Sequence, residues 1–124
     1  MATSPKKKEW VSANQKWTYK AGQKYGYTVF PNLLFWYAAD LGINPPQQAV
    51  LFQLLSYWWF ADNPPVVSKA RLGEGLGITA RQVQRHLRAL EKAGLIEIRV
   101  PHRPGRHPNE YTFDGLVKNL RRFR

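Results

Sequence analysis

Apolar residues recur with a helical period in the second half of the chain. Val83, Leu87 and Leu90 stand at positions i, i+4 and i+7, so they lie on one face of a helix. The pattern predicts a helix from about residue 80 to residue 92. Gly94 comes shortly after a lysine in the last turn and suits the C′ position, where the chain leaves a helix.

A shorter helix precedes this one and is joined to it by a tight turn. Ser68 and Thr79 are residue types that cap helix N-termini, and each stands directly before a helical pattern. We expect Gly75 and Gly77 to supply the backbone freedom with which the short helix stops. The apolar side of the short helix consists of Ala70, Leu72 and Leu76. A helix-turn-helix unit is therefore predicted at about residues 68–93.

The chain after Gly94 has the pattern of a β-hairpin, predicted at about residues 95–113. The first strand contains Leu95, Ile96, Ile98 and Val100. The loop PHRPGRHPN follows, and the sequence EYTF forms the returning strand. Asp114 is expected to cap a last helix that runs from Gly115 to about Phe123. The residues expected to face inward are Leu116, Val117 and Leu120.

Two helices are predicted upstream of the helix-turn-helix unit. One begins at Pro31 and runs to about Leu41, where Gly42 ends it. The other begins after Asn44 and runs from Pro45 to about Phe60. Its apolar set consists of Val50, Leu51, Leu54, Leu55, Trp58 and Trp59. We expect this second helix to be the scaffold against which the helix-turn-helix unit packs.

The first 24 residues are polar and basic, and we expect them to form a partly flexible arm. The arm includes the run Lys6, Lys7 and Lys8. Such an arm can enter a minor groove or follow phosphates, and the alternative is a solubilising terminus. Directly after it, the alternation of Tyr25, Tyr27 and Val29 predicts a short edge strand.

Charge is concentrated at the two ends of the 124-residue chain. The net charge is +11: residues 1–30 carry +5, residues 31–67 carry −2 and residues 68–124 carry +8. Such a field accelerates encounters with a polyanion and makes affinity depend on salt. Nucleic acid is therefore the predicted partner. An anionic membrane surface is less favoured, because no basic amphipathic helix has a broad apolar face.

The second helix of the unit carries its cations opposite its apolar residues. At about 100° per residue, one stripe contains Arg81, Arg85, Arg88 and Lys92. Arginines are suited to phosphates and guanine edges, and Gln82 and Gln84 are predicted adenine readers. Ser68, Lys69 and Thr79 are expected to hold phosphates near helix N-termini. The alternative is a solvated charged face.

The loop of the hairpin is also basic. Arg103, Arg106 and His107 surround Gly105, whose lack of a side chain allows close approach to a groove floor. The Arg-Pro-Gly-Arg run indicates insertion into a minor groove, where the potential of a narrow groove favours arginine. The alternative is an ordinary solvated hairpin loop.

The sequence contains no recognisable catalytic or metal-binding set. The eight carboxylates are scattered, the three histidines lack a ligand spacing, and there is no cysteine. We therefore expect no enzyme activity, no cofactor, no metal and no small-molecule ligand. The best apolar run is interrupted by Asp40, Pro45 and Pro46, which argues against a membrane span. The lack of cysteine fits the cytoplasm.

The run VVSKARLGEGLGITARQVQRHLRALEKAGLIEIR resembles the winged helix-turn-helix domains of bacterial regulators and of phage and plasmid replication proteins. The preceding run YTVFPNLLFWYAADLGINPPQQAVLFQLLSYWW is similar to the lead-in of the replication-protein branch. The resemblance implies a mainly α fold with a small β-hairpin wing. It also implies DNA binding through a recognition helix in the major groove.

These features predict a winged helix-turn-helix domain over residues 25–124 that binds double-stranded DNA in the cytoplasm, at the nucleoid. The predicted role is transcription regulation, as a repressor of a short operator, because the chain has no room for an ATPase or a replisome-recruiting module. The first alternative is a plasmid or phage replication or partition protein that binds origin repeats, which the resemblance favours. The second is a protein-interaction module, which explains the charge of +11 poorly.

We also expect a homodimer. Aromatic side chains before residue 61 exceed what a small core covers: Trp36, Tyr37, Tyr57, Trp59 and Phe60. A contiguous exposed aromatic patch would mark a dimer or partner surface. Many helix-turn-helix proteins read paired half-sites, which favours a second copy as the partner.

Overall fold

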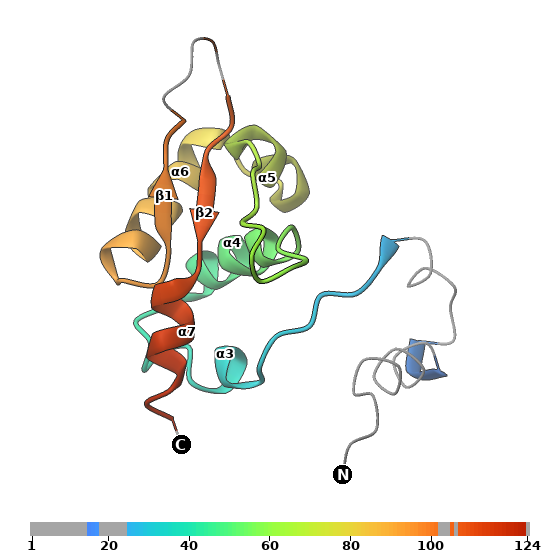
Figure 1. Ribbon diagram of the computed structural model, residues 1–124, viewed down its shortest axis with the longest axis vertical. Coiled ribbons are helices and arrows are strands. Elements are labelled where there is room, and N and C mark those ends of the chain that lie inside the picture. Colours follow the sequence, from blue (N-terminus) through green and yellow to red (C-terminus); the bar gives the residue numbers. More distant parts are fainter. Residues whose placement is uncertain (1–14, 18–24, 102–104, 106, 124) are drawn as a thin grey trace.

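The computed structural model describes residues 15–17, 25–101, 105 and 107–123. Its elements are α3 (Leu33–Trp36), α4 (Pro45–Leu55), α5 (Lys69–Leu76), α6 (Ala80–Lys92), β1 (Glu97–Arg99), β2 (Glu110–Thr112) and α7 (Asp114–Leu120). In Figure 1 the β-hairpin and α7 lie in front of α4 and α6, and α3 lies at the lower end. The described part of the chain contains no helix long and apolar enough to cross a membrane.

The core is built where α4, α5 and α6 contact one another. Val50, Leu51 and Leu54 of α4 are completely buried, which confirms α4 as the scaffold helix. The three residues predicted to form the apolar stripe of α6 are buried against it. Burial of such side chains away from water provides the main favourable free energy of this fold.

The two helix-turn-helix segments begin and end as their capping residues predict. The Ser68 hydroxyl accepts from the Arg71 N–H at 3.1 Å, and Gly77 ends α5 with a φ of +71°. The Thr79 hydroxyl accepts from the Gln82 N–H at 3.1 Å, while the Gln82 side chain accepts from the Thr79 N–H at 2.9 Å. This reciprocal capping box starts α6 at the predicted residue.

Gly75 has a different role from the one predicted. It lies inside α5 and does not have a positive φ, so it does not form the turn. A Cβ atom at this position would collide with the side-chain amide of Gln53 in α4. Gly75 is exposed and lies beside the flexible end of the Gln53 side chain, and Gly77 alone supplies the left-handed residue that ends the helix.

The two upstream helices are shorter than predicted. After α3, the chain turns through residues 37–42 and buries Leu41 and Ile43 against the core. The helix α4 ends at Leu55 because side chains compete for the carbonyls that would continue it. The Ser56 hydroxyl donates to the Gln53 carbonyl at 2.6 Å, and the Trp59 indole donates to the Ser56 carbonyl at 2.8 Å.

The edge strand predicted at Tyr25, Tyr27 and Val29 is absent, since residues 26–30 have no regular secondary structure. The outer edge of β2 is already paired by another segment. The Tyr111 N–H donates to the Pro65 carbonyl at 3.1 Å, and the Val67 N–H donates to the Asn109 carbonyl at 3.3 Å. This segment occupies the backbone groups that an additional strand would need.

The strands β1 and β2 form the predicted antiparallel hairpin, with Ile98 opposite Tyr111. The following helix differs in two details. Asp114 lies in the first turn of α7 without capping it, because Phe113 occupies the N-cap position. Val117 is 41% exposed, so it does not face inward as predicted. Phe123 follows α7 and packs on Tyr37, with their ring centroids 5.0 Å apart.

Candidate nucleic-acid interface

The helix α6 has one buried face and one strongly cationic exposed face. Its buried side is formed by Val83, Leu87 and Leu90. On the opposite side all four predicted cations are exposed: Arg81, Arg85, Arg88 and Lys92. None of the four forms an ion pair with another described residue. We call these four side chains the cationic stripe. Their charges remain available to an external anion.

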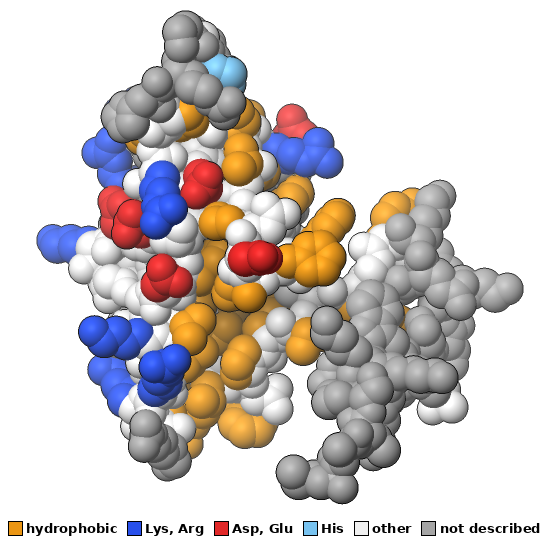
Figure 2. All heavy atoms as spheres, in the orientation of Figure 1, with side chains coloured by type: hydrophobic (Ala, Val, Ile, Leu, Met, Phe, Trp, Pro, Cys, Tyr) orange, Lys and Arg blue, Asp and Glu red, His pale blue; other side chains and the backbone are white. Residues whose placement is uncertain are grey.

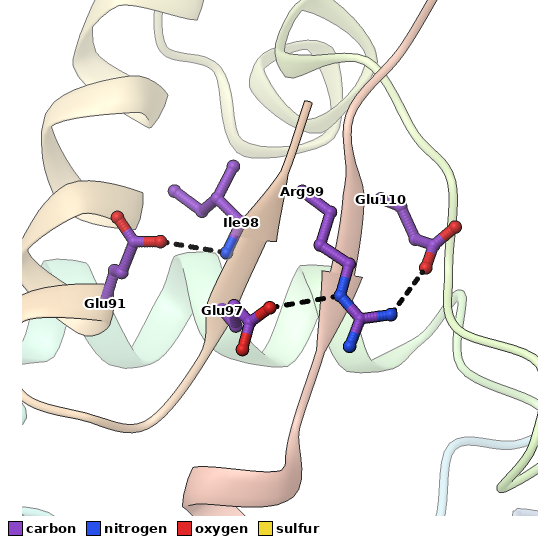
Figure 3. A network of polar contacts seen from close by, with 5 residues as sticks. All are labelled: Glu91, Glu97, Ile98, Arg99 and Glu110. Carbon is purple, nitrogen blue, oxygen red and sulfur yellow. Dashed lines mark hydrogen bonds and ion pairs between the residues drawn. The ribbon is translucent and has the colours of Figure 1, made fainter. Parts of the chain in front are cut away.

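The carboxylate nearest to the stripe is engaged elsewhere. Glu91 precedes Lys92 on α6, and one of its oxygens accepts from the Ile98 N–H at 2.9 Å (Figure 3). This bond ties the C-terminal half of α6 to β1. It also turns the only acidic side chain of α6 toward the hairpin and away from the arginines.

Arg99, by contrast, lies between two carboxylates at the base of the hairpin (Figure 3). Its Nε is 3.1 Å from a Glu97 oxygen, and one terminal nitrogen is 3.4 Å from a Glu110 oxygen. The hydrogen bond and the charge of Glu97, followed by the charge of Glu110, raise the pKa of Arg99 above its ordinary value. This arginine is neutralised within the protein and is therefore a poor candidate for phosphate binding.

Two predicted site residues at the start of α6 are held by each other. The Gln82 carbonyl oxygen accepts from the Thr79 N–H at 2.9 Å and from the Thr79 hydroxyl at 3.3 Å. The Gln82 amide NH₂ and the exposed Arg81 are the groups left for an external ligand. Thr79 acts in the structure as a helix cap, as Ser68 does for α5.

Two further predicted residues connect α5 to α6. The Lys69 ammonium donates to the Gln84 carbonyl oxygen at 2.7 Å. The pair lines a groove of about 600 Å³ that lies between α6 and the base of the hairpin. Arg88 and Lys92 also line this groove. The groove thus joins part of the cationic stripe to the hairpin.

The structure adds a groove residue that the sequence patterns did not single out. Asn109 lines the groove from the last position before β2. Its carbonyl accepts from Val67, a residue 42 positions earlier in the chain, so no local spacing indicates its position. Glu91 also lines the groove. In the sequence, Glu91 stands seven residues after Gln84 and therefore on the same face of the helix, and this spacing indicates that the two side chains lie near each other.

The remaining predicted contacts lie mostly outside the described residues. These are Arg103 and Arg106 in the hairpin loop and the arm residues Lys6, Lys7 and Lys8. Within the described part of the loop, Gly105 has a φ of +90° and His107 is exposed. The left-handed conformation at Gly105 is one that other residues rarely adopt, which agrees with a sharp turn there.

Apolar side chains dominate the face that carries the hairpin and α7. Figure 2 shows them as a band through the middle and lower part of this view, with Lys and Arg side chains along its left margin. Among the described residues of the first 60, seven aromatic residues are exposed: Trp17, Tyr25, Phe35, Trp36, Tyr37, Trp59 and Phe60. Tyr57, which was also predicted to be in surplus, is instead partly buried against the core. No cluster of three His, Cys, Asp or Glu side chains suited to a metal ion occurs among the described residues.

A helix pair with a tight turn, a cationic second helix and a following antiparallel hairpin define a winged helix-turn-helix domain. Residues 61–97 match the family described as "Winged helix-turn-helix DNA-binding", a span that contains α5, α6 and the start of β1. The predicted fold and family resemblance are thereby confirmed, and the chain contains a DNA-binding domain of this class. No curated protein shows significant sequence similarity to the chain.

Proposed function

We propose that this protein binds specific sites in double-stranded DNA and regulates transcription, as a repressor of a short operator. The observation that supports the proposal most strongly is the cationic stripe. Its four side chains are exposed, lie opposite the buried face of α6 and have no carboxylate partner among the described residues. Because an ordinary solvated helix gains from interspersed ion pairs, their absence favours an external polyanion.

In the proposed complex, α6 lies in the major groove. Arg81, Gln82, Arg85 and Arg88 face base edges, and Lys92 faces the backbone near the end of the helix. Lys69 and Gln84, which are 2.7 Å apart beside the groove, lie where the strand between major groove and wing would pass. The caps at Ser68 and Thr79 leave the first backbone N–H groups of α5 and α6 for phosphates.

The wing and the arm extend this interface in the proposal. Arg103, Arg106 and His107 enter the adjacent minor groove, and the three lysines at positions 6–8 follow phosphates. Their composition supports these roles, because both segments are basic.

We also propose that the protein acts as a homodimer in the cytoplasm, at the nucleoid. One copy presents one recognition helix, and a two-fold pair would read two half-sites about one helical turn apart. The aromatic residues support a second copy as the partner. Trp36 is 71% exposed and Trp59 is 78% exposed, which is unfavourable for a monomer in water.

Selection of genomic DNA fragments by the purified chain, at about 150 mM salt, tests the proposal. We expect an inverted repeat at a promoter. Repeats clustered at an origin or a partition locus would instead indicate the replication or partition role, and the similarity of residues 27–59 to the replication-protein branch makes that the second candidate. Failure to enrich any sequence would contradict specific DNA binding and favour a protein-interaction module.

A further inference from the structure

The hydrogen-bond acceptors on the exposed surface of α6 are turned toward the protein itself. The Gln82 oxygen receives two hydrogen bonds from Thr79, at 2.9 and 3.3 Å. The Gln84 oxygen receives one from Lys69 at 2.7 Å. The Glu91 carboxylate receives one from the Ile98 N–H at 2.9 Å. The Gln82 and Gln84 oxygens and one of the two Glu91 oxygens thus accept from donors within the protein.

His86 does not change this inventory. It stands three residues after Val83 and four before Leu90, in the row of side chains that faces the core. Its side chain is partly buried, as that of Gln84 is, but it projects well away from the cationic stripe around the helix. The side of α6 that carries the cationic stripe therefore contains no further side-chain acceptor.

The partners of the two glutamines determine how their amides are oriented. A backbone N–H and a lysine ammonium can only donate, so they must face the amide oxygen and not the NH₂ group. At Gln82 the two hydrogen bonds from Thr79 fill both acceptor positions of that oxygen. Gln82 is then left only with its NH₂ group, which can only donate, for contact with DNA. At Gln84 the oxygen faces Lys69, so the NH₂ group is the part of the amide directed away from this donor.

We infer that α6 selects guanine, and that the operator carries at least two guanines on the strand facing this helix. In the major groove only guanine shows two adjacent acceptors, N7 and O6. Adenine shows one acceptor beside an amino donor, thymine shows one acceptor beside a methyl group, and cytosine shows an amino donor. A surface that presents four cations and two amide NH₂ groups can use both acceptors of guanine, at most one of adenine or thymine, and none of cytosine. The inference rests on the proposed DNA binding, and it replaces the adenine-reading role predicted for Gln82 and Gln84 with a donor role.

Selection from a pool of random duplexes, followed by base-analogue substitution, tests this specificity. We expect enriched sites with paired guanines, and a loss of affinity of about tenfold or more when 7-deazaguanine removes N7 at those positions. Inosine retains N7 and O6 and lacks only the minor-groove amino group. Its substitution should therefore change affinity by less than about twofold.

A matched pair of variants tests the amide orientation. Gln82→Glu keeps the oxygen that caps α6 and replaces the donating NH₂ by an acceptor. Gln47→Glu makes the same change in the equivalent capping box at the start of α4, where the Gln47 side chain accepts from the Asn44 N–H at 3.1 Å. Each substitution lowers the net charge of the protein by one, so any general electrostatic weakening of DNA binding should be similar in the two variants.

The expected results separate the two positions. Gln82→Glu should weaken binding to the guanine site by about tenfold or more and shift the selected base toward cytosine, whose N4 amino group donates. Gln47→Glu should retain the selected sequence and most of the affinity. Thermal unfolding of both variants checks that the caps persist.

The failure of this inference is distinguishable from the failure of the proposed function. Enriched sites dominated by A·T pairs, insensitivity to 7-deazaguanine, or an unchanged selected base in Gln82→Glu would overturn guanine selection while leaving specific DNA binding intact. The absence of any enriched sequence would overturn both.

Discussion

The outer face of α6 and the base of the hairpin both carry arginine, yet their arginines have opposite surroundings. On α6, Arg85 and Arg88 are exposed and have no ion pair among the described residues. At the hairpin, Arg99 is held between Glu97 and Glu110. The two regions are joined by the hydrogen bond between Glu91 and the Ile98 N–H.

The difference shows that an arginine marks a binding surface only when its charge is not compensated inside the protein. Glu91, Glu97 and Glu110 are each used in an internal contact, whereas the cations of α6 have no ion pair among the described residues. An exposed ion pair at the surface adds little stability, typically about 0–1 kcal/mol. The Arg99 cluster therefore organises the hairpin locally, and the cationic stripe is the surface whose charges remain available to an external anion.

The largest expected effect is that of Arg85→Ala on DNA binding. We expect a loss of about 1–3 kcal/mol and relaxed selectivity at one base pair, because a base contact is removed. Arg99→Ala is the matched control, and its affinity should stay within about 0.5 kcal/mol of the parent. Titration of a labelled operator measures both. If Arg85→Ala weakened binding equally on every sequence, Arg85 would contact phosphate instead.

The next effect is expected from Thr79→Ala. Loss of the hydroxyl leaves the first turn of α6 without its side-chain cap, which should lower the free energy of unfolding by about 1 kcal/mol. Urea denaturation measures the change. Ser68→Ala at the start of α5 is the comparison, because Ser68 accepts from the Arg71 N–H but has no reciprocal side chain. An unchanged midpoint for Thr79→Ala would show that the cap contributes nothing.

A smaller effect is expected when Arg103 and Arg106 are both replaced by alanine. Affinity should fall less than in Arg85→Ala, and the fall should be greatest when the flanks of the operator are A·T-rich, where a narrow minor groove attracts arginine. Binding to operators with A·T-rich and G·C-rich flanks measures the difference. If parent and variant bound the operator with A·T-rich flanks equally tightly, the two arginines of the wing would not contact DNA.

The smallest effect on specificity is expected when residues 1–8 are removed. This deletion eliminates three lysines, so the slope of log K against log salt should become shallower by up to about 3 while the selected sequence is retained. Binding at four or more salt concentrations measures the slope. Complete loss of binding would show that the arm makes indispensable contacts.

Local signals predicted the helix-turn-helix unit accurately. Ser68, Thr79 and Gly77 act on backbone groups within a few residues of themselves, so their effect could be read without the fold. The i, i+4, i+7 spacing of Val83, Leu87 and Leu90 placed the cationic stripe opposite the core for the same reason. The upstream region was predicted less well. The apolar pattern continues past the ends of both helices, since Leu41 is buried from a turn after α3 and the Ser56 and Trp59 side chains hydrogen-bond to carbonyls at the end of α4.

The sequence by itself determined the period, the caps and the cationic stripe, because each depends on neighbours along one helix. Tertiary structure decided which polar groups of α6 accept hydrogen bonds from within the protein and which are exposed without such a partner. The orientation of the Gln84 amide depends on Lys69, 15 residues away, and glycine is required at position 115 because the backbone carbonyl of Gly94 lies where a Cβ atom would stand. Such contacts join segments that are distant in the chain, so no local pattern encodes them. The chemistry that α6 offers to DNA is therefore a product of the folded domain.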